Sequence, residues 1–261
     1  MEKFDLLQDI AKRTNGDIYL GIVGPVRTGK STFIKRFMDL MVLPNITDVH
    51  DKERTKDALP QSGAGRTIMT TEPKFVPDDG VEITIDNIKF RVRMVDCVGY
   101  AVEGALGYSD EDGPRMVLTP WFEEPIPFEE AAELGTQKVI ADHSTIGLVV
   151  TTDGTITDLP RSAYVNAEER VIAELQNLGK PYLVLLNSSD PFAPETMELR
   201  AELEEKYQAA VVPIDASRLN QTDIQGILRE ILYEFPIREV GVNLPLWVNV
   251  LDSKHWLRRK L

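Results

Sequence analysis

Short apolar runs alternate with amphipathic stretches along most of this chain of 261 residues. Uninterrupted apolar runs predict buried strands at 18–23, 145–151, 181–186 and 211–214. Apolar residues recur instead at helical spacing in other segments, which predicts helices at 4–13, 31–41, 162–178, 195–207 and 221–233. Because strands and helices alternate, we predict an α/β fold with a mainly parallel sheet flanked by helices.

A few segments depart from this alternation. The runs 81–85 and 88–95 predict a β-hairpin with a two-residue turn. The polar stretch 43–65 predicts a long flexible loop, and 99–127, rich in Gly, Pro and acidic residues, predicts a long irregular segment. Near the end of the chain, the apolar stretch 240–250 is compatible with a strand or an interface segment.

The strongest chemical feature is the octapeptide Gly-Pro-Val-Arg-Thr-Gly-Lys-Ser, which runs from Gly24 to Ser31. It has the form G-x-x-x-x-G-K-[ST] of a phosphate-binding loop and joins a predicted strand to a predicted helix. Gly24 and Gly29 let the backbone turn tightly against phosphate oxygens, Lys30 reaches the β- and γ-phosphates, and Ser31 offers a hydroxyl to Mg²⁺. Since N–H groups and the helix dipole converge there, the loop predicts a nucleoside triphosphate site.

Two further segments supply candidate groups for the γ-phosphate and the metal. Asp96 and Gly99 form Asp-x-x-Gly at the end of a predicted strand, where the Asp holds Mg²⁺ through water and the Gly N–H meets the γ-phosphate. Thr70 and Thr71 are the better candidates for a threonine that binds Mg²⁺ and senses the γ-phosphate, with Thr67 as an alternative. The expected metal ligands are Ser31, Thr70, Thr71 and Asp96.

Loops after two later strands are candidates for contact with the base. Asn187 and Asp190 occupy the positions of Asn and Asp in the Asn-Lys-x-Asp loop that binds guanine. The Asp of that loop accepts hydrogen bonds from the base. The Lys that packs over the base is Ser188 here, so the choice between adenine and guanine stays open. Ala216 and Ser217 follow a further strand, where a backbone loop can touch the base edge.

Together these patterns predict the residues around the nucleotide: Gly24, Arg27, Thr28, Gly29, Lys30, Ser31, Thr32, Gly99, Asn187, Asp190, Ala216 and Ser217. We hypothesise that Arg27 supplies positive charge near the β–γ bridging oxygen during hydrolysis; a solvent-facing Arg is the alternative. Tyr100 follows Asp-x-x-Gly where a glutamine could orient water, so hydrolysis must use another group or be slow. The catalytic candidates are Lys30, Asp96, Thr70, Thr71 and Arg27.

Composition narrows the class of protein. A net charge of −13 argues against a general nucleic-acid binder and against electrostatic adhesion to anionic lipid. No apolar run reaches the roughly 18 residues of a membrane span, and the charged N-terminus lacks the long apolar core of a signal peptide. A single cysteine, Cys97, excludes an internal disulfide framework and makes a reducing cytosol the simplest compartment. The acidic pairs Glu123-Glu124 and Glu129-Glu130 are interpreted as a solvated loop and a helix N-terminus.

Longer runs of sequence carry a more specific resemblance. They include Gly-Asp-Ile-Tyr-Leu-Gly at 16–21, the segments 67–77, 95–100 and 113–116, Thr-Pro-Trp at 119–121, and the segments 124–128, 143–147, 243–245 and 255–258. On these runs the chain resembles the stage IV sporulation protein A family, the spore-coat morphogenetic ATPases of endospore-forming bacteria. The resemblance extends over essentially all 261 residues.

The resemblance implies a P-loop NTPase of the translation-factor-like GTPase lineage that hydrolyses ATP with Mg²⁺. The family uses hydrolysis to polymerise into the basement layer of the spore coat, in the mother-cell cytosol at the outer surface of the forespore. The implied partners are further copies of the chain, a small amphipathic membrane-anchoring peptide and spore coat proteins, without nucleic acid and without direct membrane insertion. The family's Walker lysine, metal aspartate and sensor threonines carry over to Lys30, Asp96, Thr70 and Thr71.

We therefore expect a P-loop NTPase domain over 1–240, and the start of a following region of a longer protein over 241–261. A Mg-ATPase that drives self-assembly is favoured by the resemblance. A GTP-dependent regulatory switch stays open because Asp190 is present, and a scaffold with negligible turnover stays open because the glutamine is absent. The segment 99–127 is the leading candidate for assembly, since an element next to the γ-phosphate must also reach a neighbour.

Overall fold

The computed structural model describes residues 17–46, 48–57, 59, 74–85, 88–105, 109–110, 113–119 and 122–234. Several predictions fall outside this part of the chain: the helix at 4–13, the threonines Thr67, Thr70 and Thr71, the apolar stretch 240–250 and the domain boundary at 240.

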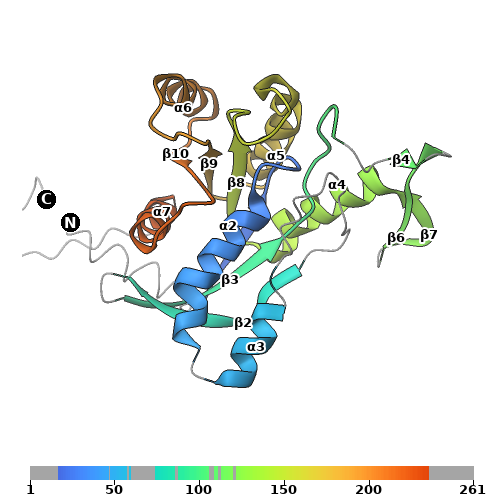
Figure 1. Ribbon diagram of the computed structural model, residues 1–261. Helices are drawn as coiled ribbons and strands as arrows, with labels where there is room; N and C mark the ends of the chain where they lie inside the picture. Colours follow the sequence, from blue (N-terminus) through green and yellow to red (C-terminus); the bar gives the residue numbers. More distant parts are fainter. Residues whose placement is uncertain are drawn as a thin grey trace, which may run out of the picture.

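A six-stranded sheet with the order β10-β9-β8-β1-β3-β2 forms the centre of the fold (Figure 1). Its strands are β1 (Asp17–Val23), β2 (Lys74–Ile85), β3 (Ile88–Asp96), β8 (Ile146–Thr152), β9 (Tyr182–Asn187) and β10 (Val211–Ile214). Every neighbouring pair is parallel except β2 and β3, which form the predicted hairpin. The predicted α/β fold with a mainly parallel sheet is therefore confirmed.

Helices cover both faces of the sheet: α2 (Lys30–Phe37), α5 (Val165–Asn177), α6 (Pro194–Tyr207) and α7 (Gln221–Tyr233). The alternation of side chains along each strand divides the core in two. Leu148 of β8 packs in one cluster with residues of α2 and α7, whereas the next residue, Val149, packs in a second cluster with residues of α5 and α6. Because both faces are covered, all seven residues of β8 are buried, which explains its uninterrupted apolar run.

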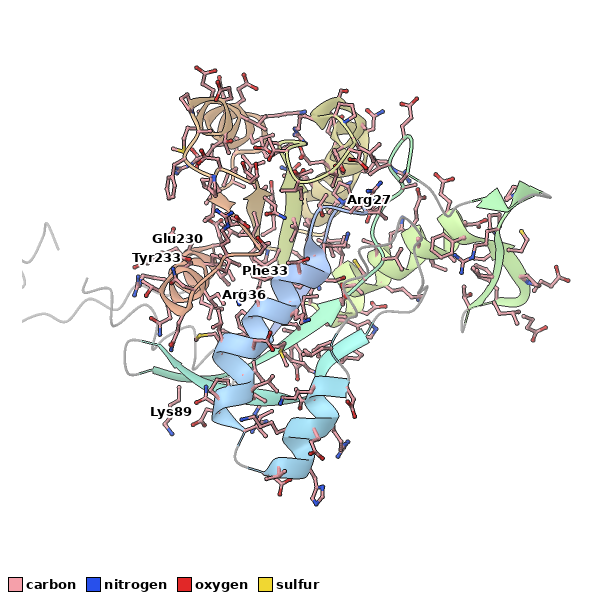
Figure 2. All side chains as sticks on the ribbon, in the orientation of Figure 1. Arg27, Phe33, Arg36, Lys89, Glu230 and Tyr233 are labelled. Carbon is pink, nitrogen blue, oxygen red and sulfur yellow. The ribbon has the colours of Figure 1, made fainter. Side chains whose placement is uncertain are left out.

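The ends of these helices follow the local sequence. Helix α2 continues through a π-helical turn (Met38–Val42), so the helix predicted at 31–41 is confirmed with a wider last turn. Arg36 lies on α2 (Figure 2). It donates to the carbonyl oxygen of Leu219, 2.5 Å away, in the loop that leads to α7. Helix α7 starts at a capping box in which Asn220 and Asp223 each bind the other's backbone N–H.

The prediction of a flexible loop at 43–65 is wrong for the first half of this range. It contains a 3₁₀ turn (Leu43–Asn45) and a helix, α3 (Val49–Asp57). The sequence Val-His-Asp-Lys-Glu-Arg-Thr-Lys-Asp has no apolar stripe, so hydrophobic periodicity does not indicate this helix. Asp48 begins it by accepting the N–H of His50 on its Oδ1 atom at 2.8 Å.

The irregular segment predicted at 99–127 holds regular structure as well. Two small hairpins pair β4 (Ser109–Asp110) with β5 (Gly113–Pro114), and β6 (Met116–Thr119) with β7 (Phe122–Pro127). They lie away from the central sheet, and α4 (Phe128–Lys138) connects them to it (Figure 1). Glu129 and Glu130 form the first turn of α4 as expected, whereas Glu123 and Glu124 are exposed on a strand rather than in a loop.

Candidate nucleotide-binding site

The phosphate loop connects the end of β1 to the start of α2. Gly24 and Gly29 have φ angles of 135° and 95°, a region that side chains with a Cβ rarely adopt. A Cβ on Gly24 would also overlap the carbonyl oxygen of Val150 on the neighbouring strand. The two glycines of the motif are thus required by the backbone path that places the loop N–H groups at the N-terminus of α2.

Lys30 is buried in the first turn of α2, with 5% of its surface exposed. Its Nζ donates to the carbonyl oxygens of Gly24 at 3.2 Å and Pro25 at 2.6 Å. Burial lowers the pKa of Lys30, while the nearby Cys97 and Asp96 oppose that shift. An ammonium has three N–H donors, so one is left beyond these two bonds for an anion in the loop.

Ser31 and Asp96 come together because their strands are neighbours. Ile22 of β1 pairs with Asp96 of β3, and α2 begins shortly after β1. The Ser31 hydroxyl donates to Oδ2 of Asp96 at 3.4 Å. A hydroxyl and a carboxylate are oxygen ligands of the kind that Mg²⁺ takes, and Mg²⁺ usually completes its shell with water and substrate phosphates. These two residues therefore fit the metal, and among the described residues no cluster of three His, Cys, Asp or Glu offers another site.

Gly99 lies directly against the phosphate loop. Its φ is 96°, and a Cβ at this position would overlap the carbonyl oxygen of Gly24 and come within 2.6 Å of Nζ of Lys30. The next residue, Tyr100, donates its N–H to the Gly24 carbonyl at 3.3 Å and accepts the N–H of Val26 at 2.9 Å. The Asp-x-x-Gly segment is thereby attached to the loop by backbone hydrogen bonds.

Cys97 lies inside this segment and is packed, with 7% of its surface exposed. Its thiol donates to the carbonyl oxygen of Ile22 at 3.2 Å, and burial raises its pKa to about 11. Nucleophilic and redox chemistry needs the thiolate, and burial disfavours this form.

Asn187, at the end of β9, joins three loops of the site. Its Nδ2 donates to the carbonyl oxygen of Thr28 at 2.9 Å, and its Oδ1 accepts the N–H of Ala216 at 3.0 Å. The side chain is buried, and a Cβ on Gly29 would collide with it. The structure thus places Asn187 between the phosphate loop and the loop after β10, a supporting role that its motif alone does not indicate.

The remaining candidates for base contact are held by local bonds. Asp190 is exposed and accepts the N–H of Phe192 on Oδ1 at 3.2 Å. Ser217 is exposed as well, and its hydroxyl donates to Oδ1 of Asp215 at 2.6 Å. Ser188, at the position of the guanine-loop lysine, is buried and bonded to Thr196, so no long side chain covers a base from this position.

Arg27 stands on the phosphate loop, which leads into α2 (Figure 2). Its φ is 61°, so it occupies the left-handed region without being glycine, and its side chain is partly exposed. Thr28 is buried and donates its hydroxyl to the Pro25 carbonyl at 3.0 Å, while Thr32 is half-buried in the first turn of α2. The left-handed conformation at Arg27 is a strained feature at a candidate functional site.

The chain is similar to known proteins over nearly its whole length. A family model described as "Stage IV sporulation protein A, ATPase domain" matches residues 1–236. The chain is 60% identical to Stage IV sporulation protein A of Bacillus subtilis (strain 168) and 58% identical to that of Bacillus anthracis, over 99% of this chain and 53% of each relative. The chain thus spans about half the length of the curated relatives it matches.

A crystal structure of an SsGBP variant aligns with a TM-score of 0.47 and 17% identity, covering 89% of this chain and 61% of that one. A score at this level carries no conclusion about lineage. The family match, in contrast, covers the phosphate loop, the Asp-x-x-Gly segment and every described element of the sheet. The chain belongs to the Stage IV sporulation protein A family and matches its ATPase domain.

Proposed function

We propose that this domain binds ATP with Mg²⁺ at the phosphate loop and hydrolyses it. The observation that carries the proposal is the convergence of Lys30, Ser31, Asp96 and Gly99 on one helix N-terminus, although they come from two separate parts of the sequence. A phosphate loop, a metal aspartate and a γ-phosphate glycine are the parts that phosphoryl transfer requires. The matching family model is described as an ATPase domain, which supports hydrolysis over binding alone.

Each residue has a role that its position allows. The remaining N–H donor of Lys30 and the N–H groups of the loop bind the phosphate oxygens. Ser31 and Asp96 would hold Mg²⁺, with Thr70 and Thr71 proposed as further ligands that sense the γ-phosphate. When bound, the metal neutralises charge on the β- and γ-phosphates. Gly99 gives its backbone N–H to the γ-phosphate because no side chain separates it from the loop.

Arg27 is the candidate for charge stabilisation during hydrolysis. It is a cation on the loop that cradles the phosphates, and its side chain is partly exposed rather than packed. Negative charge that develops between the β- and γ-phosphates would be stabilised by a guanidinium held at this place. Tyr100 does not orient water in place of the absent glutamine, because its hydroxyl donates to Glu174 on α5.

ATP is the proposed substrate, with a GTP-dependent switch as the second candidate. Asn187 donates to the Thr28 carbonyl and accepts from Ala216, which supports a structural role over base selection. The buried Ser188 in place of lysine also weakens a guanine site. The second candidate rests on one observation, the exposed carboxylate of Asp190 in the loop after β9. Ala216 and Ser217 remain proposed contacts to the base edge.

For the whole protein, we propose that hydrolysis drives self-assembly into the spore coat basement layer on the forespore surface, in the mother-cell cytoplasm. The domain assigned to 1–240 would be an NTPase of the translation-factor-like lineage, with the following region beginning at 241–261. Coat proteins and an amphipathic anchoring peptide would bind the full-length protein, and the domain itself would bind no nucleic acid. In the described residues no helix is both long and apolar enough to cross a bilayer.

The segment 99–127 is the proposed assembly element. Its β6–β7 hairpin lies away from the sheet and exposes Met116, Leu118 and Phe122, by 54%, 67% and 47% of their surfaces. Deleting residues 106–112 in the full-length protein should preserve ATP binding and block assembly, seen by sedimentation with ATP. Normal assembly of the deletion variant would refute this role.

Steady-state phosphate release tests the proposed activity. Mg-ATP and Mg-GTP are supplied in parallel, with Lys30→Ala as the blank. Release from ATP alone supports the ATPase, and preference for GTP supports the switch. Release from neither substrate, by this domain and by the full-length protein alike, contradicts both.

A further inference from the structure

Tyr100 is attached to the nucleotide site by its backbone and to the opposite face of the sheet by its side chain. Its N–H and carbonyl oxygen bond to Gly24 and Val26 of the phosphate loop. Its ring is fully buried in the core cluster that includes residues of α5. The residue therefore connects the loop with a helix behind the sheet.

The side chain ends in a polar cluster between α4 and α5. The Tyr100 hydroxyl donates to Oε1 of Glu174 on α5, and the same oxygen accepts Nε2 of Gln137 on α4 at 3.0 Å. Arg170 of α5 lies over the Tyr100 ring, 4.7 Å from its centroid, and forms an ion pair with Glu133 of α4 at 2.7 Å. Two helices thus hold the ring and its hydroxyl.

The position of Tyr100 fixes the residues before it. Gly99 precedes it and touches the Gly24 carbonyl and Lys30, and Asp96 stands four positions before it against Ser31. If the Tyr100 ring left its pocket, the backbone bonds to Gly24 and Val26 would be lost and Gly99 would move away from the loop. Tyr100 therefore links the backbone next to Gly99 with a bond made on the other side of the sheet.

We propose that Tyr100 is a positioning residue: its hydrogen bond to Glu174 clamps the segment from Asp96 to Tyr100 against the phosphate loop, so that the Gly99 N–H faces the γ-phosphate. The proposal rests on the proposed function of this site and assigns Tyr100 no contact with nucleotide or water. The hydroxyl–carboxylate bond keeps the clamp closed, and the ring provides the packing.

The chain offers a matched control in Tyr207. Its hydroxyl donates to Oε1 of Glu168 at 2.7 Å, so it too bonds to a glutamate of α5, but from α6. The carbonyl oxygen of Tyr207 accepts from Gln176 and Tyr182, at the end of the molecule where β9 begins. Tyr100→Phe and Tyr207→Phe each remove one phenol–carboxylate bond. Only the first should alter the site.

Cys97 provides a probe of the clamp that does not depend on catalysis. It is the single cysteine of the sequence, lies between Asp96 and Tyr100, and is buried. A thiol reagent such as DTNB therefore reacts only when the segment opens or the whole protein unfolds. Losing the bond to a charged acceptor should raise the labelling rate about tenfold in Tyr100→Phe, and Tyr207→Phe should stay within about twofold of wild type.

Two variants of Glu174 localise the effect. Glu174→Ala should accelerate labelling as Tyr100→Phe does, and the double variant should be no faster than either single one, because both remove the same bond. Glu174→Gln keeps an oxygen acceptor and should restore most of the protection. Equal acceleration in Tyr100→Phe and Tyr207→Phe, or wild-type labelling in Tyr100→Phe, would overturn the clamp.

Turnover then tests its role in the site. Tyr100→Phe should lower kcat for ATP about tenfold while KM changes by less than about twofold, because the phosphate loop itself is intact. Tyr207→Phe should keep the kcat of wild type. An unchanged kcat in Tyr100→Phe contradicts the positioning role. If wild type releases no phosphate at all, the proposed activity has failed instead, and the labelling rates still decide whether the clamp exists.

Discussion

The side-chain nitrogen of Asn187 lies 2.9 Å from the carbonyl oxygen of Thr28, and this bond joins the loop after β9 to the phosphate loop. The side-chain oxygen of the same amide accepts the N–H of Ala216 from the loop after β10. One buried amide thus aligns the loops after β9 and β10 with the phosphate loop.

Asn187→Ala should therefore weaken ATP and GTP binding by the same factor. It leaves a buried carbonyl and a buried N–H without their partner, which should cost about 2–4 kcal/mol of unfolding free energy. Urea unfolding and competition with a fluorescent nucleotide measure the two effects. Lys89→Ala, which removes an exposed bond to Glu82 on the β2–β3 hairpin, is the control. A selective loss of one nucleotide would show that Asn187 reads the base.

Gly99→Ala should reduce ATP turnover by about tenfold or more, because its methyl group would collide with the Gly24 carbonyl and approach Lys30. Gly179 is a matched control, with a φ of 62° and no atom within 4 Å of an added Cβ. Both variants pay a conformational cost of about 1 kcal/mol or more, visible in thermal unfolding. Only Gly99→Ala should lose phosphate release; equal losses would mean that backbone strain alone explains the result.

Arg27→Gly should lower kcat about tenfold with little change in nucleotide affinity, if the guanidinium stabilises the transition state. Glycine is the suitable replacement because the φ of 61° is costly for alanine and free for glycine. Arg27→Lys keeps the charge and should retain much of the activity. Phosphate release by both variants, with affinity measured separately, gives the answer. A kcat equal to wild type in Arg27→Gly would show that Arg27 faces solvent only.

Cys97 should make the protein less stable in alkali. Its folded-state pKa of about 11 lies above the ordinary value of 9.0, so the folded state holds the proton more tightly than the unfolded state. Its contribution is fully present below pH 9 and is lost as the pH rises toward 11. Between pH 8 and pH 10.5, wild type should lose about 2 kcal/mol more unfolding free energy than Cys97→Ala. Parallel loss in the two proteins, measured by urea unfolding, would contradict this.

The parts of the site that depend on local sequence could be predicted. The spacing from Gly24 to Ser31 places the loop at a helix start whatever the tertiary structure, and the runs that became β10 and α7 match their predicted bounds of 211–214 and 221–233. The Asp-x-x-Gly motif is equally local, so Asp96 and Gly99 could be proposed as partners of the loop.

Long-range contacts could not be predicted. Tyr100 and Glu174 are 74 positions apart, and no periodicity indicates that they meet. The sequence shows only that Tyr100 stands where a glutamine could orient water. The bonds of Asn187 to Thr28 and Ala216 could not be predicted either, because the motif around Asn187 indicates only contact with a base. Helix α3 was missed for a different reason, since its charged sequence leaves no apolar stripe to detect.

Two aspartates at the carboxyl edge of the sheet provide the most direct test of the proposed metal site. Asp96 bonds to Ser31, whereas Asp153, after β8, accepts hydrogen bonds from Thr155 at 2.7 Å and Thr196 at 3.0 Å. Phosphate release from Mg-ATP should fall about a hundredfold or more in Asp96→Asn and stay near wild type in Asp153→Asn, with both variants checked for folding. Full activity in Asp96→Asn, or equal loss in both variants, would contradict the assignment of the catalytic site.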